Sequence, residues 1–179
     1  MISNEHKCIF LHPNKCGGKS VEYLLWGVEP KSSSADHRFI NEVYDEYGEE
    51  NVSGYYKFMF CRNPWERLVS IYHGRKQILK QKLPSFEKFV LKADPSRKPF
   101  RAQILWIKYK DRYEVDFIGR FENYAQDWKK VCKVLGIEKE LVKLNSSSYL
   151  PFKEYYNDRL KDFVAKQYKE DIDFFGYDF

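Results

Sequence analysis

A glycine-rich segment near the start of the chain has the composition of a phosphate-binding loop: Lys15, Cys16, Gly17, Gly18, Lys19 and Ser20. It follows a short apolar run at 7–11 and precedes a helical pattern of apolar residues that begins near Ser20. Backbone N–H groups at the start of a helix attract anions, and glycines let a ligand come close to the backbone. The two lysines add positive charge, so the segment predicts a site for a phosphate or a similar anion.

Residues 13–20 also fit the Walker pattern GxxxxGK[ST], except that Pro13 stands where the first glycine belongs. Kinases of this type hold Mg²⁺ with a carboxylate, and ligands gather at the carboxyl ends of the strands. The predicted strand at 55–61 has no acidic residue, and Asp116 comes at the start of its strand. Both observations weaken the interpretation as a P-loop nucleotide kinase that uses ATP and Mg²⁺, which stays open as an alternative.

A second candidate anion site begins at Arg62, directly after the most apolar predicted strand, 55–61. Asn63 and Pro64 are suited to the N-cap and first position of a helix, which would carry Ser70 two turns later. An arginine at a strand end and a hydroxyl on the next helix can bind one phosphate together. The alternative is that Arg62 pairs with an acidic residue and Ser70 only packs.

Strands and helices alternate along the chain, which predicts an α/β fold, a P-loop-like parallel sheet flanked by helices. The length of 179 residues fits a single domain over residues 1–179. The expected strands are 7–11, 55–61, 115–119 and 141–144, and the expected helices are 20–25, 38–49, 63–79, 85–93, 100–109, 123–135 and 155–170.

The composition excludes a disordered or membrane-spanning chain, since 43% of the residues are hydrophobic and 32% are charged, without a long apolar run. Residues 62–113 hold 14 basic and 4 acidic residues in a chain of net charge +5. A basic middle favours an anionic ligand or partner, although a solvated cationic face would have the same composition. The start lacks the apolar segment of a secretory signal and the four cysteines form no CxxC motif, so we expect a cytoplasmic location.

Taken together, these motifs resemble the sulfotransferase family that depends on 3′-phosphoadenosine 5′-phosphosulfate (PAPS), closest to its carbohydrate-type, Golgi-like and bacterial branch. Residues 10–20 are similar to the family's 5′-phosphosulfate loop, and residues 58–72 resemble its 3′-phosphate motif. Residues 118–123 with Asp127, and the ending 168–177, resemble further family segments in the same order. The chain departs from the pattern where Asn14 separates Pro13 from Lys15, and where Cys16 and Lys19 replace threonines common in the family.

The resemblance implies a metal-independent, in-line transfer of a sulfuryl group from PAPS to a hydroxyl acceptor, a carbohydrate. It gives Lys15 the catalytic role at the leaving phosphate and makes the residues from Lys15 to Ser20 the cradle of the 5′-phosphosulfate. Arg62 and Ser70 would bind the 3′-phosphate, with Ser146 and Ser147 as further donor contacts. The product would be 3′-phosphoadenosine 5′-phosphate, and neither nucleic acid nor membrane is expected as a partner.

An acceptor hydroxyl also needs a base. His12 has the usual family position before the loop, where a structural role is expected, so His37 is the predicted general base and Glu42 a weaker substitute. The candidate acceptor contacts are Arg101, Gln103 and Arg120, and the basic segment 75–112 would suit an anionic glycan. A third interpretation is a polyanion-binding module that has kept the fold and lost activity, because Cys16 and Lys19 could mark degeneration.

Overall fold

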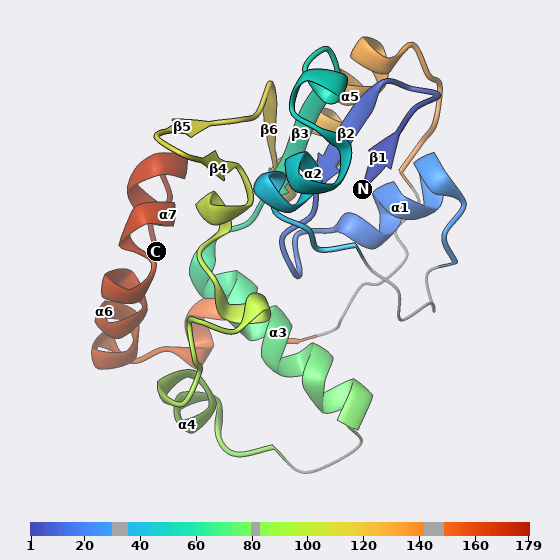
Figure 1. Ribbon diagram of the computed structural model, residues 1–179. Helices are drawn as coiled ribbons and strands as arrows, with labels where there is room; N and C mark the ends of the chain where they lie inside the picture. Colours follow the sequence, from blue (N-terminus) through green and yellow to red (C-terminus); the bar gives the residue numbers. More distant parts are fainter. Residues whose placement is uncertain (30–35, 80–82, 142–148) are drawn as a thin grey trace. The chain divides into compact units, whose positions relative to one another are not determined.

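The computed structural model describes residues 1–29, 36–79, 83–141 and 149–179 (Figure 1). The chain forms two compact units. The first, called the sheet unit, comprises Met1–Cys61 and Leu105–Leu144, and the second, called the helical unit, comprises Arg62–Ile104 and Asn145–Phe179. The single domain expected over residues 1–179 stays a prediction.

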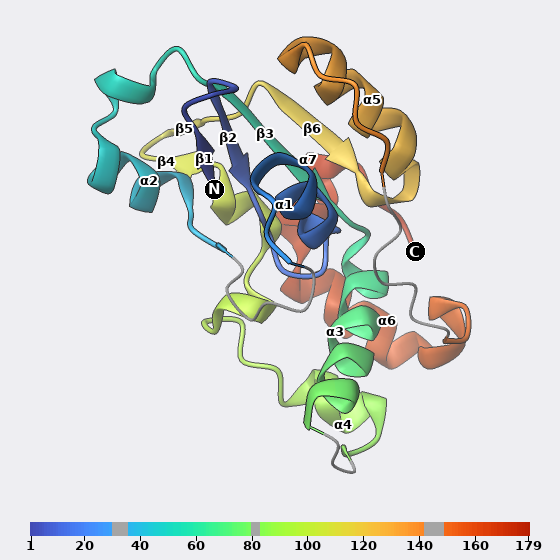
Figure 2. The same cartoon turned by 90° about the vertical axis from the view of Figure 1, so that its right-hand side faces the viewer.

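The sheet unit is built on four strands in the order β1-β2-β3-β6. Figure 2 shows β2 (Cys8–Leu11), β3 (Tyr56–Cys61) and β6 (Phe117–Arg120) side by side and parallel, with β1 (Ile2–Ser3) antiparallel to β2. Leu11 pairs with Met59 and Cys61 pairs with Arg120, so the parallel strands end at one edge of the sheet. The predicted α/β fold with a parallel sheet is confirmed.

One face of this sheet is covered by two helices, α1 (Gly18–Trp26) and α5 (Tyr124–Leu135). Val21 of α1 and Trp128 of α5 pack with Phe10 and Phe58 in a common apolar core. Full burial of a side chain of this size stabilises a fold by roughly 1.5–3 kcal/mol. The sheet unit also contains α2 (Ile40–Tyr47), η1 (Glu50–Val52), β4 (Lys108–Tyr109), β5 (Arg112–Tyr113) and η4 (Phe121–Asn123).

The helical unit is built around α3, which packs against α4, α6 and η5. Its core includes Trp65, Leu68 and Leu160. Asn63 caps α3 as the sequence predicts, since its Oδ1 accepts the N–H of Trp65 at 3.0 Å. The elements of this unit are α3 (Pro64–Leu79), α4 (Phe86–Leu91), η2 (Lys98–Phe100), η5 (Phe152–Tyr155), α6 (Asp158–Gln167) and α7 (Lys169–Phe175), and η3 (Gln103–Trp106) contains the boundary between the units.

The predicted helix at 100–109 is wrong. The structure has the short 3-10 turns η2 and η3 there, followed by β4. The backbone N–H groups of Gln103 and Ile104 donate to the Asp171 carboxylate at 2.8 and 2.9 Å, so they are not available for helical hydrogen bonds. A partner 67 residues away in the sequence therefore overrides the local pattern.

Two further differences are smaller. The helix expected at 155–170 is divided, because Asn157 caps a new start at Asp158 and the helical run is interrupted at Tyr168. The third strand begins at Phe117 rather than at residue 115. The strand expected at 141–144 lies, from residue 142 onward, outside the described residues.

The four cysteines lie inside the fold. All four are buried thiols, and burial raises the pKa of Cys8 to about 12. Of the helices in the described ranges, none is both long and apolar enough to span a bilayer.

Candidate functional site

The loop between β2 and α1 has the backbone geometry of an anion nest. Lys15 and Gly17 have φ angles of 68° and 86°, in the left-handed region. Gly17 is the N-cap of α1 and supplies no side-chain cap, and no described residue accepts a hydrogen bond from the N–H of Gly17 or Gly18. These two donors lie at the positive end of the helix dipole, so the loop is suited to a phosphate or sulfate oxygen.

Steric contacts explain why both glycines are needed. A Cβ atom on Gly18 would lie 1.8 Å from Nε2 of His12, and one on Gly17 would lie 2.7 Å from the ring of Tyr124. Real Cβ atoms essentially never approach other atoms so closely. The loop can therefore present bare backbone to a ligand only because no side chain fills this space.

The side chain of Tyr124 supports the loop by hydrogen bonding, and the sequence analysis did not identify it. Its hydroxyl donates to the carbonyl of Gly17 at 2.6 Å and hydrogen-bonds the Ser20 hydroxyl. Burial raises the pKa of Tyr124 well above its usual range, so the phenol stays protonated and keeps donating. The one available signal was its spacing from Trp128 and Val131, which places all three on the buried face of α5.

The remaining loop side chains differ in exposure. Lys15 is exposed, Lys19 is half-buried, and Ser20 is buried. Cys16 is only 1% exposed, and its thiol donates to the carbonyl of Asn14 at 3.7 Å. The cysteine that replaces the family's threonine therefore belongs to the core, and its contribution to the loop is its backbone.

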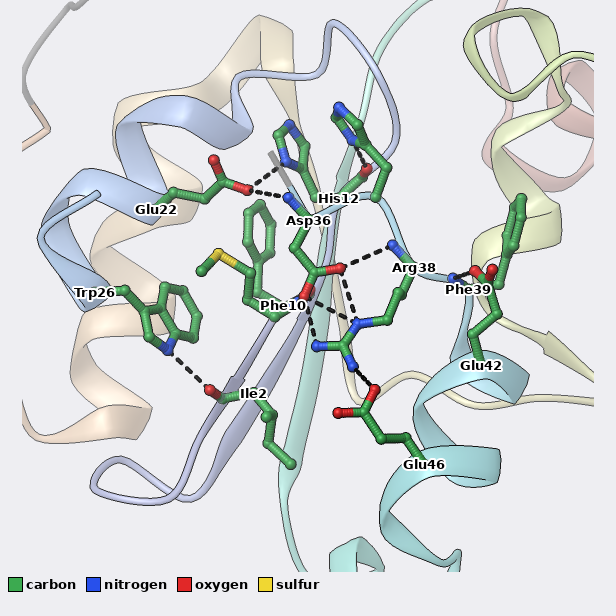
Figure 3. Close-up of polar contacts among 12 residues, drawn as sticks. Ile2, Phe10, His12, Glu22, Trp26, Asp36, Arg38, Phe39, Glu42 and Glu46 are labelled. Atoms are coloured by element: carbon green, nitrogen blue, oxygen red, sulfur yellow. Dashed lines mark hydrogen bonds and ion pairs between the residues drawn. The ribbon is translucent and has the colours of Figure 1, made fainter. Parts of the chain in front are cut away.

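Beside the loop, a buried carboxylate organises two histidines (Figure 3). His12 and Glu22 are 3% and 2% exposed, and His12 Nδ1 lies 3.0 Å from Glu22 Oε1. The Nδ1 atom of His37 lies 2.7 Å from the carbonyl oxygen of His12. A carbonyl can only accept, so His37 carries its proton on Nδ1 and, when neutral, has its lone pair on Nε2.

Glu22 also fixes the chain next to His37. Its Oε1 accepts the N–H of Asp36 at 3.3 Å, and the rings of His12 and His37 lie 4.4 Å apart. The Glu42 carboxylate, the weaker candidate for a base, instead accepts the N–H of Phe39 at 2.7 Å and caps α2. His37 is therefore the better placed of the two predicted bases.

In the helical unit, Arg62 is buried and held by its neighbours. Its Nη2 donates to Glu66 Oε1 at 2.7 Å and to the hydroxyl of Tyr149 at 2.9 Å, and its exposure is 5%. Pairing with an acidic residue, the alternative that the sequence left open for Arg62, is thus present. Ser70 is also buried, and it follows Glu66 by one helical turn on the same face of α3.

The backbone of Arg62 is gripped by the side chain of Gln103. The Gln103 amide accepts the Arg62 N–H and donates to the Arg62 carbonyl, both at 2.8 Å, and it also donates to Asp171 at 3.1 Å. Burial raises the pKa of Asp171, although hydrogen bonds from Gln103 and Ile104 oppose this. The Gln103 side chain is fully buried and positions the backbone of Arg62, and its expected contact with an acceptor stays a prediction.

An aromatic group completes this part of α3. His73 follows Ser70 on the same face, and its ring stacks on Tyr149 at 4.9 Å. Its Nε2 lies 2.8 Å from the hydroxyl of Tyr155. Burial lowers the pKa of His73, which favours the neutral ring. Arg62, Ser70, His73 and Tyr149 therefore share one side of the helix.

The other candidate contacts are less defined. Arg101 donates from Nε to the carbonyl of Ser96 at 2.8 Å, and Arg120 ends β6, where its N–H donates to Asp127 at 2.8 Å. Arg120 thus lies at the edge of the sheet from which the loop emerges. Ser146 and Ser147 lie outside the described residues.

The position of Asp116 bears on the kinase alternative. Its carboxylate accepts the N–H of Lys57 at 2.7 Å, next to the start of β3. The loop leaves the opposite edge of this sheet, at the carboxyl ends of the strands. Asp116 is therefore not placed to bind the metal ion of a nucleotide in the loop, which disfavours a P-loop kinase.

Comparisons with known proteins point to one family. The model of the sulfotransferase family matches residues 1–178. An uncharacterised protein of Archaeoglobus fulgidus is 34% identical over 112 residues, 59% of this chain and 89% of that protein. Human carbohydrate sulfotransferase 9 is 24% identical over 218 alignment positions, which cover 96% of this chain and 47% of the human protein.

A solved structure was also found. The crystal structure of a sulfotransferase from Alicyclobacillus acidocaldarius has a TM-score of 0.42 and 19% identity, covering 78% of this chain and 60% of that one. The chain thus spans less than half the length of the human relative and about three fifths of the bacterial one.

Proposed function

Because the chain belongs to the sulfotransferase family, we propose that it transfers a sulfuryl group from PAPS to a hydroxyl group of a carbohydrate acceptor. The observation that supports the donor part is the loop, where Gly17 and Gly18 present two N–H groups at the start of α1 that no residue in the described part of the chain accepts. The carbohydrate part is supported by the likeness to human carbohydrate sulfotransferase 9. A single catalytic domain of residues 1–179 is part of the proposal.

The residues present fit the donor at both of its anionic ends. The loop N–H groups, with Lys15 and Lys19, would hold the 5′-phosphosulfate, which carries negative charge and many acceptor oxygens. Arg62 and Ser70 would hold the 3′-phosphate, for which the Arg62 guanidinium exchanges its contacts with Glu66 and Tyr149. Cations and N–H donors would thus meet both ends, and we propose that the transfer uses no metal ion.

When bound, PAPS supplies the sulfuryl group and leaves as 3′-phosphoadenosine 5′-phosphate. Lys15 stabilises the negative charge that grows on the leaving phosphate, an effect that is large where a charge is placed in advance. His37 accepts the proton of the acceptor hydroxyl at Nε2, since its Nδ1 proton is engaged with the His12 carbonyl. Glu22 keeps His12 in place and so orients His37 indirectly.

The donor assignment is tested by thermal unfolding with 3′-phosphoadenosine 5′-phosphate, beside ATP with Mg²⁺. A ligand at 100 times its dissociation constant adds about 2.7 kcal/mol, a shift of roughly 5–10 °C at this size. We expect this shift with the bisphosphate alone, and its loss in Lys15→Ala and Arg62→Ala. A shift with ATP and Mg²⁺ alone would favour a kinase, and no shift with either would favour a polyanion-binding module.

The base is tested by His37→Ala. We expect this variant to keep the thermal shift with the bisphosphate and to lose sulfate transfer by roughly a hundredfold or more, the usual contribution of a general base. Transfer is followed with a panel of neutral and acidic oligosaccharides. Transfer at the wild-type rate would show that another group takes the proton.

A further inference from the structure

The ring of His12 lies against the first residue of α1, Gly18 (Figure 3). Nε2 is the ring atom nearest to the position that a Cβ atom of Gly18 would take. An ideal Cβ lies about 2.5 Å from its own backbone nitrogen, so His12 Nε2 lies no more than about 4.3 Å from the nitrogen of Gly18. Two oxygens of one sulfate or phosphate group can therefore meet both nitrogens.

This Nε2 atom has no protein partner. His12 is only 3% exposed, and in the described part of the chain its ring makes one hydrogen bond, at Nδ1. Nε2 is nevertheless not sealed from solvent, so a ligand can reach it. Buried side chains normally satisfy their polar atoms, and an unpartnered nitrogen beside two bare backbone N–H groups points to a bound group.

The Glu22 carboxylate gives the ring a role in the charge of the loop. Glu22 follows Gly18 by about one turn of α1 and is buried. A buried carboxylate next to an anion site repels the anion unless a cation stands between them. Within the described ranges, His12 is the basic side chain at ion-pair distance from Glu22, at 3.0 Å.

These contacts determine where the protons of His12 lie. A carboxylate can only accept, so the proton shared with Glu22 is on Nδ1 of His12. A neutral ring then has a lone pair on Nε2, which repels an anion, whereas a charged ring has an N–H there and donates. An anion in the loop therefore favours the charged ring, with one N–H directed to each of two anions.

We propose that His12 is a third donor of the glycine-rich loop, and that binding of a sulfate or phosphate group there is coupled to protonation of His12 at Nε2. The proton comes from the solvent, and no other bond forms or breaks. Glu22 is the positioning residue of this contact, because it fixes Nδ1 and balances the charge of the ring. The inference rests on the proposed function in that the group bound would be the 5′-phosphosulfate of PAPS.

Other charged and titratable groups surround His12. They are Glu22 on α1, Lys15 and Lys19 on the loop, Asp36 and His37 on the segment before α2, and the amino group of Met1, which lies 3.4 Å from Asp36. Burial lowers the pKa of the Met1 amino group, although Asp36 opposes this. Substitutions must therefore separate the effect of His12 from that of its neighbours.

The test is calorimetry of inorganic sulfate binding to the whole protein at constant ionic strength, between about pH 5.5 and about pH 8.5, the range in which imidazoles titrate. His12→Gln removes the ring in question, and His37→Gln removes its neighbour. The matched control is His6→Gln, the same substitution in the turn before the other end of β2.

We expect the wild type, His6→Gln and His37→Gln to bind sulfate at least about tenfold more weakly at the alkaline end of this range, the effect of one lost charge-assisted contact. His12→Gln should show almost no dependence on pH. The Met1 amino group is present in every variant, so it cannot cause this difference. A fall that persists in His12→Gln, or one that disappears in His37→Gln alone, would overturn the proposal.

Nitrogen NMR of the histidine-labelled wild type gives a readout that does not depend on the folding of a variant. At the alkaline end of the range, replacing chloride by sulfate should move the Nε2 signal of His12 toward that of a protonated ring and leave His6 unchanged. An unmoved His12 signal, or equal changes at His6, would contradict the contact. In Glu22→Gln, which keeps an acceptor for the Asp36 N–H, sulfate affinity should begin to fall at lower pH; the wild-type profile there would refute the role of Glu22.

Thermal unfolding with 3′-phosphoadenosine 5′-phosphate separates this inference from the proposed function. If the bisphosphate raises Tm and sulfate leaves the His12 signal unmoved, only the inference about His12 fails. If sulfate moves the signal and the bisphosphate gives no shift, the proposed PAPS donor fails, and the loop stays an anion site in which His12 donates.

Discussion

The close approach of Gly18 to His12 gives a sharp prediction for Gly18→Ala. The added Cβ would lie 1.8 Å from His12 Nε2, whereas ordinary contact begins near 3.4 Å. The ring must move by about 1.6 Å, which is enough to break its 3.0 Å bond to Glu22. Overpacking costs typically 1–3 kcal/mol and a lost hydrogen bond to a charged group about 1.5–3 kcal/mol, so we expect roughly 3 kcal/mol of destabilisation.

Urea and thermal unfolding measure this change, and Gly54→Ala is the matched control. A Cβ on Gly54 meets no atom within 4 Å, so this substitution should leave the free energy of unfolding nearly unchanged. For a chain of this size, about 3 kcal/mol corresponds to a lowering of Tm by roughly 6–12 °C.

A double variant tests the cause. His12→Ala removes the ring that the new methyl group would strike, so His12→Ala with Gly18→Ala should be less destabilised than the sum of the two single variants. Strict additivity, or a Gly18→Ala variant as stable as Gly54→Ala, would refute the reasoning from steric contact. Bisphosphate binding should be weakened in Gly18→Ala, because relief of the clash with His12 displaces the backbone N–H groups of the loop.

Three further predictions concern single contacts. Tyr124→Phe removes the 2.6 Å bond to the loop carbonyl, and we expect urea unfolding to show a loss of about 1 kcal/mol and calorimetry to show weaker bisphosphate binding; unchanged binding would contradict the supporting role. Glu66→Gln removes the charge that holds Arg62, so bisphosphate binding should tighten several-fold, whereas weaker binding would mean that Glu66 orients the guanidinium. Burial acts to raise the pKa of Asp36, but hydrogen bonds and charge from Arg38 outweigh it and lower the pKa below 3.8. A lowered carboxyl pKa stabilises the fold above the unfolded pKa, so wild type and Asp36→Asn should differ most in urea stability at neutral pH. The difference should begin to shrink below about pH 4 and keep shrinking as the pH falls toward the lowered pKa of the folded state; a constant difference down to pH 3 would argue against the ion pair.

Local chemistry made part of the structure predictable. The apolar run of β3, the cap at Asn63 and the left-handed Gly136 at the end of α5 depend on neighbours within one or two turns. The loop was predictable for the same reason, since a strand, two glycines and a helix start are adjacent in the chain. Arg62 was singled out as a candidate because a charge directly after a buried strand is unusual.

Contacts between residues that are far apart in the sequence could not be predicted from it. The hydroxyl of Tyr124 bonds to the carbonyl of Gly17, 107 residues away in the sequence, and neither residue type predicts this contact. The expected acceptor contact of Gln103 stays a prediction, but nothing in the sequence indicated that its amide bonds Arg62 and Asp171, 41 and 68 residues away. The Asp171 carboxylate also accepts the N–H groups of Gln103 and Ile104, which explains why the helix expected at 100–109 does not form.

The grip on the Arg62 backbone also has a consequence for synthesis on the ribosome. Gln103 and Asp171 hold Arg62 only when all three have been made, and the last of them lies in α7. At roughly 5–20 residues per second, Arg62 is translated roughly 5–20 seconds before Asp171. A nascent chain that already contains the glycine-rich loop therefore still lacks the contact that fixes its buried arginine, and the proposed anion site at Arg62 is held in place only after α7 has been made.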